Sequence, residues 1–281
     1  MPTAKRSAAR RARTYDPEKT WTALTAQVRA VSAAARGLDE GAPALPSGLP
    51  GWDVGLLLAH VVDQIEATPR LLAEPAPPGL AGRAVVGLPA WAVSTAGIAD
   101  RLDERARREA ERIAAEYGTG PAAYAAAVDA AAERLAAARP EAVRTDRLLP
   151  HRFGPMTALD MTVTRLVELV VHSDDLTRAT GAAVPLDRGA TAAVVRVLAD
   201  ALAAKAPGAA VEVRIPPFAA VQCIAGPRHT RGTPPNVVEA DPLTWIRLAT
   251  GRMSWEAARE EGTVTASGDR ADLTEVLPVL A

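Results

Sequence analysis

Residues 165–176 of the chain read RLVELVVHSDDL, an apolar run that a carboxylate and an imidazole interrupt four positions apart. If this run is a helix, Glu168 and His172 leave one face a single turn apart, close enough to bind the same metal ion. Leucine and valine occupy the other faces, and a helix that is apolar nearly all round is buried. We therefore expect Arg165 and Asp175, which share the stripe of Glu168, to point into the interior of a helical bundle.

A second buried imidazole is expected at His60, which lies in the apolar run 56–62. A helix over that run could face the helix of Glu168 and His172. Two imidazoles and one carboxylate form a three-ligand site with open coordination positions, which suits Zn²⁺ first and also Fe²⁺ or Ni²⁺. The alternative is a purely structural cluster in which Arg165 neutralises Glu168, because an unpaired carboxylate is costly away from water.

Length and net charge limit the classes of protein to which this sequence can belong. The 281 residues exceed the usual size of one domain, so two domains that share an interface are expected. The 32 basic and 33 acidic residues leave a formal charge of -1, which gives no general attraction to nucleic acid or to an anionic membrane. We expect neither nucleic acid nor membrane as a partner.

Cysteine usage and hydropathy favour a cytoplasmic protein. Cys223 is the only cysteine, which excludes an intrachain disulfide and a zinc site built on cysteines. No apolar run reaches the roughly 18 residues that span a bilayer, and no signal peptide opens the chain. Residues 1–15 carry five basic side chains and no acid. We expect a disordered basic tail there, with a weak nucleic-acid or membrane-surface tether as the alternative.

Helical spacing of apolar residues dominates the chain up to Gly181. Asp53 precedes the apolar segment from Val54 as an N-cap does, and Gly181 ends the last helical segment as a C-cap does. The Pro- and Gly-rich stretch 74–89 is predicted to be a mobile flap. The predicted helices span 17–36, a segment from Val54, 91–117, 121–139 and 156–179. They predict a bundle of four long helices and an accessory one over residues 16–183.

The pattern changes after residue 184. Residues 211–215 alternate apolar and polar side chains, which is typical of a strand. Asp241 and Pro242 form an N-cap and a first helical residue. The predicted elements are a helix over 187–206, strands over 211–215, 219–225 and 263–266, and helices that begin at 242, 254 and 272. We therefore predict an α+β protein of two domains, the second spanning residues 184–281.

Several short motifs extend the opening stretch into a family pattern. Residues 49–54 read LPGWDV, residues 57–60 read LLAH, and residues 154–156 read GPM ahead of the 165–176 segment. Together these motifs resemble the mycothiol-dependent maleylpyruvate isomerase family over about residues 17–180.

The resemblance implies a DinB-like four-helix bundle as the first domain. It also implies that His60, Glu168 and His172 bind a divalent metal, usually zinc. Mycothiol or a similar thiol is the cofactor that the resemblance implies, and a small molecule is the implied substrate.

The second domain resembles a different group. Residues 231–239 (RGTPPNVVE) and 241–251 (DPLTWIRLATG) are similar to a bacterial subgroup of sterol carrier protein-like domains. That likeness implies an α+β domain and raises the alternative of a protein that binds a lipid or acyl chain, with a structural or vestigial metal site. The isomerase family places an important arginine in the second domain, for which Arg231 and Arg247 are the candidates.

The chemistry of the site follows from the metal. A thiol bound at an open position loses its proton readily, and the thiolate could add to an electrophilic double bond or displace a leaving group. Arg165 could bind a substrate carboxylate, and Asp175 could orient His172. Cys223 is expected to pack in the core. The predicted function is a metal- and thiol-dependent isomerase or transferase, with hydrolysis by metal-bound water or a regulatory module as alternatives.

Overall fold

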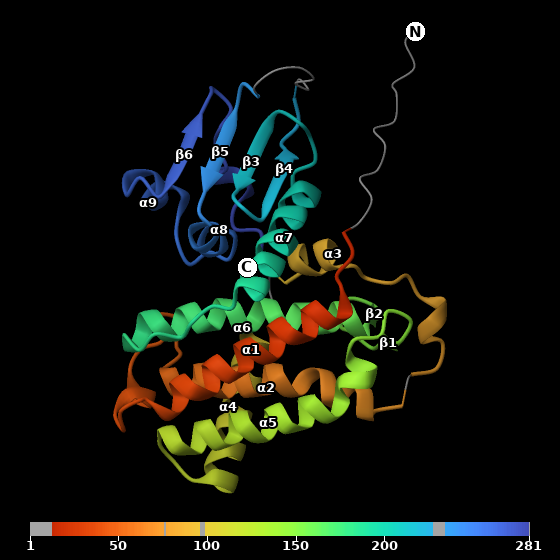
Figure 1. Ribbon diagram of the computed structural model, residues 1–281, viewed down its shortest axis with the longest axis vertical. Coiled ribbons are helices and arrows are strands. Elements are labelled where there is room, and N and C mark those ends of the chain that lie inside the picture. Colours follow the sequence, from red (N-terminus) through yellow and green to blue (C-terminus); the bar gives the residue numbers. More distant parts are fainter. Residues whose placement is uncertain (1–12, 76, 96–98, 227–233, 281) are drawn as a thin grey trace.

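The structure is a computed structural model that describes residues 13–75, 77–95, 99–226 and 234–280. Its first part is helical, and its second part carries a sheet that stands beyond the helical bundle (Figure 1). The helices of the first part are α1 (Pro17–Arg36), α2 (Val54–Ala73), α3 (Leu88–Val93), α4 (Ala99–Tyr117), α5 (Pro121–Ala142) and α6 (Ala158–Thr180). The α+β organisation in two domains is as the sequence predicts.

Predicted cap residues end α1 and α6, at Gly37 and Gly181, and begin α2, at Asp53. The side chain of Asp16 accepts a hydrogen bond from the backbone of Lys19 at the start of α1. Asp53 does the same for Leu56 at the start of α2, at 2.8 Å. Gly181 ends α6 in the left-handed conformation, with φ of 73°, which favours glycine. These caps satisfy backbone groups that a helix end leaves without partners.

The bundle packs around α2 and α6, which carry the candidate ligands. α2 lies against α4, α5 and α6, and α1 lies against α5 and α6. Both helices are lined with fully buried aliphatic residues, among them Leu57, Leu58, Leu166 and Leu169. The close packing holds the facing surfaces of α2 and α6 at fixed positions, as a shared site requires.

The second domain is a four-stranded sheet with helices. Its elements are α7 (Arg188–Lys205), β3 (Val211–Ile215), β4 (Ala219–Cys223), β5 (Val237–Ala240), α8 (Pro242–Ala249), α9 (Trp255–Glu260) and β6 (Val264–Ser267). The strand order is β4-β3-β5-β6, with β3 parallel to β5 and the other pairs antiparallel. Val211, Val213 and Ile215 are buried on one side of β3, in the alternation that the sequence predicts.

Helix α7 joins the two parts. It contacts β4 and α8 of its own domain, and it also contacts α1, α3 and α6 of the bundle (Figure 1). Arg13, inside the predicted tail, binds Asp200 of α7 with an Nε–Oδ2 distance of 2.8 Å. The rest of that tail, residues 1–12, lies outside the described residues.

Two helix predictions are wrong. The predicted helix over 91–117 is divided into α3 and α4. The hydroxyls of Ser94 and Thr95 donate to the last carbonyls of α3, at 2.7 and 2.9 Å, and such local bonds compete with helix continuation. The predicted last helix is only a 3-10 turn at Thr274–Val276. Pro278 lacks an N–H and holds the preceding residue, Leu277, in an extended conformation.

Some elements were not predicted. The segment between α5 and α6 contains a hairpin of two short strands, β1 (Leu148–Leu149) and β2 (Met156–Thr157). The sequence predicts no strand at β5, which lies partly within the motif of residues 231–239. The predicted flap holds a 3-10 turn at Leu80–Gly82 and the start of α3.

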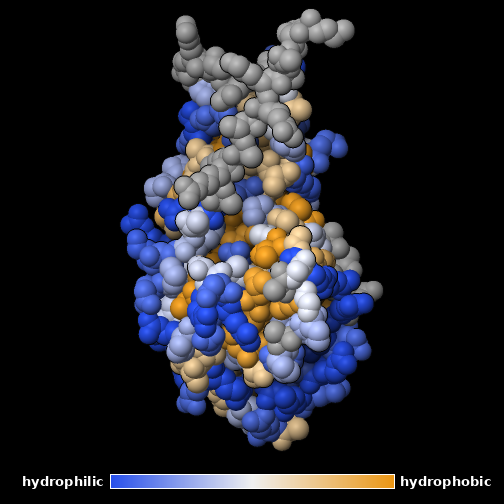
Figure 2. All heavy atoms as spheres, turned by 90° about the vertical axis from the view of Figure 1, so that its right-hand side faces the viewer, coloured by the Kyte–Doolittle hydropathy of each residue, from blue (hydrophilic) through white to orange (hydrophobic). Residues whose placement is uncertain are grey.

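The surface carries apolar side chains near the junction of the domains. Figure 2 shows them about half-way up the molecule, at the height of α3 and the β1–β2 hairpin, above a largely hydrophilic region. Val85, just before α3, and Val93, the last residue of α3, are among the exposed large hydrophobic residues. Within the described residues, no helix has the length and apolar character needed to cross a bilayer.

Candidate metal centre

His60 on α2 faces Glu168 and His172 on α6. The Nε2 atom of His60 lies 3.5 Å from Oε2 of Glu168, and Nε2 of His172 lies 3.3 Å from the same oxygen. One possible ligand atom from each residue lies within 4.8 Å of the other two. The imidazole rings meet edge to face, with centroids 4.9 Å apart. The fold therefore brings together three residues that the sequence predicts as ligands, although 108 positions separate His60 from Glu168.

The cluster is closed on the histidine side and open on the carboxylate side. The side chain of His60 is 2% exposed and that of His172 is 7% exposed, whereas that of Glu168 is 21% exposed. Trp52 packs against His60 with ring centroids 5.2 Å apart. Among these three side chains, that of Glu168 is the most accessible to a small molecule.

The protonation states of His60 and Glu168 suit metal binding. Burial lowers the pKa of His60 and so favours the neutral imidazole. Burial alone would raise the pKa of Glu168, but the hydrogen bonds to both histidines and the charge of Arg165 hold it well below its usual range. A neutral imidazole and an ionised carboxylate are the forms that ligate metals. Burial alone would lower the pKa of His172, but its hydrogen bonds to Asp175 and Glu168 raise it, so metal binding there displaces a proton. Two nitrogen donors and one oxygen donor fit Zn²⁺ with an open position.

Asp175 contacts the second ring nitrogen of His172, the one that points away from Glu168. Its Oδ2 lies 3.0 Å from Nδ1 of His172, which leaves Nε2 directed at Glu168. Burial alone would raise the pKa of Asp175, but the hydrogen bond to His172 and the charge of Arg252 lower it to about 2. A carboxylate on the second nitrogen is the usual support of a histidine that binds a metal.

The second domain contributes arginines at this end of α6. Arg252 binds Asp175, with an Nη2–Oδ2 distance of 3.0 Å. Arg247, a predicted site residue, binds Asp174 through two hydrogen bonds of 2.8 and 2.6 Å. The other predicted arginine, Arg231, lies outside the described residues. Arg247 thus joins the domains next to the cluster.

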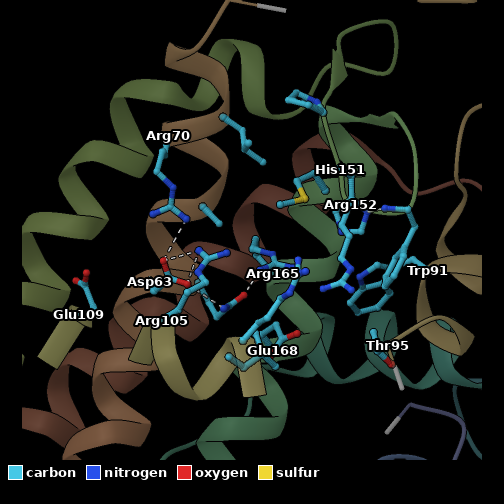
Figure 3. Close-up of a pocket in the computed structure, with 18 of the residues that line it drawn as sticks. Asp63, Arg70, Trp91, Thr95, Arg105, Glu109, His151, Arg152, Arg165 and Glu168 are labelled. Carbon is cyan, nitrogen blue, oxygen red and sulfur yellow. Dashed lines mark hydrogen bonds and ion pairs between the residues drawn. The ribbon is translucent and has the colours of Figure 1, made fainter. Parts of the chain in front are cut away.

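A cavity of about 690 Å³ lies on the open side of Glu168. In Figure 3, Arg165 and Glu168 point into it, and Asp63 lies between Arg70 and Arg105. The arginines that line it are Arg70, Arg101, Arg105, Arg108, Arg112, Arg152 and Arg165. The cavity wall is therefore rich in positive charge and suits an anionic small molecule.

Arg165 is the buried arginine of this wall. It is 8% exposed. It donates to the side-chain oxygen of Gln64 and to the hydroxyl of Thr164, the latter at 3.0 and 3.1 Å. These oxygens are neutral, so a carboxylate of a ligand would be a stronger partner for the guanidinium. His151 lines the same cavity, where burial and the charge of Arg165 lower its pKa to about 4.

Residues 24–177 match a family model described as the mycothiol maleylpyruvate isomerase N-terminal domain, and this match covers more than half of the chain. The chain belongs to this family. Residues 187–279 match a second model, described as a bacterial SCP ortholog. In this mycothiol maleylpyruvate isomerase family member, the candidate ligands lie within the first matched region.

Solved structures share this fold. A crystal structure of the mycothiol-dependent maleylpyruvate isomerase has a TM-score of 0.56 and 18% identity, covering 90% of this chain and 93% of that chain. A histidine-to-alanine mutant of that enzyme has the same TM-score and coverage at 17% identity. A comparison with curated proteins finds no match.

The sequence predicts the candidate ligands of this family member but not the arginines that α4 contributes to the cavity wall. The signal was present in α4, where Arg101, Arg105, Arg108 and Arg112 recur at helical spacing and so share one face. Arg252 carried no such signal, because it follows Gly251 in a loop.

Within its described residues, the second domain offers no support for an apolar ligand. Its interior is occupied by its own side chains, with Val213, Val238, Trp245 and Leu248 each 2% exposed or less. Cys223 is buried there as well, as the sequence predicts.

Proposed function

We propose that this protein is an enzyme in which His60, Glu168 and His172 bind a divalent metal, with Zn²⁺ the preferred ion. A low-molecular-weight thiol, mycothiol or a similar one, is its cofactor. Its reaction is the isomerisation of a small anionic electrophile or the transfer of the thiol to it. The observation that carries the proposal is the three-ligand cluster at the edge of an arginine-lined cavity.

The nucleophile must come from outside the chain. Cys223 is the only thiol, and burial raises its pKa to about 11, so it stays protonated at neutral pH. A metal ion held by the cluster favours the deprotonated, nucleophilic form of a thiol that reaches it. Membership of the mycothiol family supports mycothiol as that thiol.

The residues of the cavity determine which electrophile binds. Arg165 is placed to bind a carboxylate of the substrate, close to Glu168 and hence to the cluster. Holding that carboxylate fixes the orientation of a neighbouring double bond toward the thiol. Maleylpyruvate, for which the structurally similar enzyme is named, is an anionic electrophile of this class.

The reaction then needs no further reactant. The thiolate adds to the electron-poor double bond, rotation about the resulting single bond follows, and expulsion of the thiolate restores the double bond with the opposite geometry. In the transferase variant a leaving group departs instead and the thioether remains. The arginines stabilise the negative charge that the addition moves onto the electron-withdrawing group conjugated with the double bond.

Metal analysis and a thiol screen test the proposal. Purified full-length protein should contain one equivalent of metal, and His60→Ala and Glu168→Gln should contain little. His151→Ala is the matched control, because His151 lines the cavity without belonging to the cluster, and it should keep its metal. Turnover of maleylpyruvate should require mycothiol and fail with no thiol.

Two outcomes would contradict the proposal. One is equal metal content in the wild type and in the His60 and Glu168 variants. The other is a metal-loaded protein that turns over neither maleylpyruvate nor other anionic electrophiles with any low-molecular-weight thiol.

A further inference from the structure

Arg252, in the second domain, binds Asp175, the carboxylate that contacts the candidate ligand His172. Its Nη2 lies 3.0 Å from Oδ2 of Asp175, and its Nε lies 3.3 Å from Oδ1. Its Nη1 donates to the backbone carbonyl of Thr250 at 2.8 Å. The guanidinium is therefore held at both ends, by the loop after α8 and by the carboxylate on α6.

The same carboxylate oxygen serves two partners. Oδ2 of Asp175 contacts Nη2 of Arg252 and Nδ1 of His172, each at 3.0 Å. Nε2 of His172 is in turn 3.3 Å from Oε2 of Glu168. A continuous series of contacts thus runs from the second domain, through Asp175, to two of the candidate metal ligands.

The geometry explains how Arg252 can fix the orientation of the His172 ring through Asp175. An ionised carboxylate only accepts hydrogen bonds, so Nδ1 of His172 must donate to Asp175. In the neutral imidazole, which is the form that binds a metal, that donation leaves the lone pair on Nε2, the atom that faces the cluster. Contact with both oxygens of Asp175 stops the carboxylate from turning, and a fixed carboxylate fixes the plane of the imidazole.

We infer that Arg252 is a positioning residue of the metal centre, through which docking of the second domain sets the affinity for the metal. The inference rests on the metal site of the proposed function. It assigns Arg252 no contact with substrate, thiol or metal.

The chain supplies a matched comparison next to this contact. Arg247 binds Asp174 with two hydrogen bonds, also from the second domain to α6. Within the described residues, no hydrogen bond joins Asp174 to His60, Glu168 or His172, whereas one joins Asp175 to His172. Both arginines hold the domains together, but only Arg252 does so through the partner of a candidate ligand.

Zinc affinity of the full-length protein tests the inference. Chelator competition at constant pH should give a Kd about tenfold weaker for Arg252→Gln, by analogy with the effects of supporting residues at other metal sites. Arg247→Gln should stay within about twofold of the wild type, because it removes an interdomain contact of the same kind without touching the support of His172. Arg252→Lys keeps the charge and should lie between the wild type and Arg252→Gln.

A double-mutant cycle distinguishes action through Asp175 from a general loss of docking. Asp175→Asn should weaken zinc binding by about 10- to 100-fold, and adding Arg252→Gln to it should change the affinity no further. The Co²⁺-loaded protein gives a second readout, since a disturbed His172 should alter its visible spectrum in Arg252→Gln and leave it unaltered in Arg247→Gln.

The outcomes separate the inference from the proposed function. Equal zinc affinity in wild type and Arg252→Gln, equal losses in the two arginine variants, or additive losses in the cycle would each overturn the inference alone. A wild-type protein that binds no zinc would overturn the proposed metal site, and the inference with it.

Discussion

The side-chain amide of Gln27 on α1 donates a hydrogen bond of 2.8 Å to the hydroxyl of Ser173 on α6. The same nitrogen lies 3.2 Å from the carbonyl oxygen of Pro185, and the amide oxygen accepts from the backbone N–H of Asp187 at 3.0 Å. Gln27 is fully buried. One polar side chain in the core therefore links the bundle to the segment that leads into the second domain.

We predict that Gln27→Leu lowers the free energy of unfolding by about 2 kcal/mol or more, because it leaves buried groups around it without hydrogen bonds. Urea denaturation followed by circular dichroism measures the change. Gln222→Leu is the matched control, since Gln222 is exposed on β4, and it should shift stability by no more than about 0.5 kcal/mol. Equal effects of the two substitutions would contradict the assigned role of Gln27.

The buried guanidinium of Arg165 gives a prediction about substrate charge. Arg165→Gln should lower kcat/KM for an anionic electrophile by about 10- to 100-fold, the value of a charge-assisted hydrogen bond. A neutral electrophile should lose much less. Arg108→Gln is the control, because Arg108 also lines the cavity but is exposed and paired with Glu104, and it should change kcat/KM little. Equal losses for charged and neutral electrophiles would contradict carboxylate binding by Arg165.

The lowered pKa of His151 leads us to predict that the folded protein loses stability in mild acid. Burial and the charge of Arg165 lower its pKa from 6.5 to about 4, so the unfolded chain binds the proton more readily than the folded one. The wild type should therefore be at full stability above pH 6.5 and lose about 1 to 3 kcal/mol as the pH falls to 4, after allowance for partial exposure. His151→Gln should lose less over the same range. Denaturation curves at stepped pH values measure the difference, and parallel losses in both proteins would show that His151 does not titrate in this way.

Metal binding should raise thermal stability. Zinc at a free concentration 100 times its Kd should stabilise the folded state by about 2.7 kcal/mol relative to chelator-treated protein. His172→Ala should show no such response, whereas His151→Ala should respond as the wild type does. Thermal unfolding followed by calorimetry, with and without added zinc, measures the shift in Tm. A full zinc response in His172→Ala would place the metal elsewhere.

Much of the bundle could be predicted because its signals are local. Asp53 and Gly181 mark helix ends through backbone hydrogen bonding and a left-handed φ, and both effects act within a few residues. The candidate ligands were equally visible, since His60, Glu168 and His172 are polar residues in apolar helices that must face a partner.

The remaining features depend on long-range packing. β5 pairs with β3 and β6, and its own four residues carry too short a pattern to distinguish a strand from a loop. The contact of Arg252 with Asp175 joins residues 77 positions apart across a domain interface. No periodicity in the sequence reports such a contact, because it depends on how two finished domains dock.

Helix α7 limits how freely the second matched region can be exchanged between relatives, because it packs against both domains. The second region begins at residue 187 and so includes α7, yet Ala190, Val194 and Val197 are among the buried residues of a helix that packs on α1, α3 and α6 as well as on β4 and α8. A second domain taken from another relative would bring an α7 shaped for a different bundle. Recombination at this boundary should therefore succeed only when the bundle-facing side of α7 is carried over from the recipient protein.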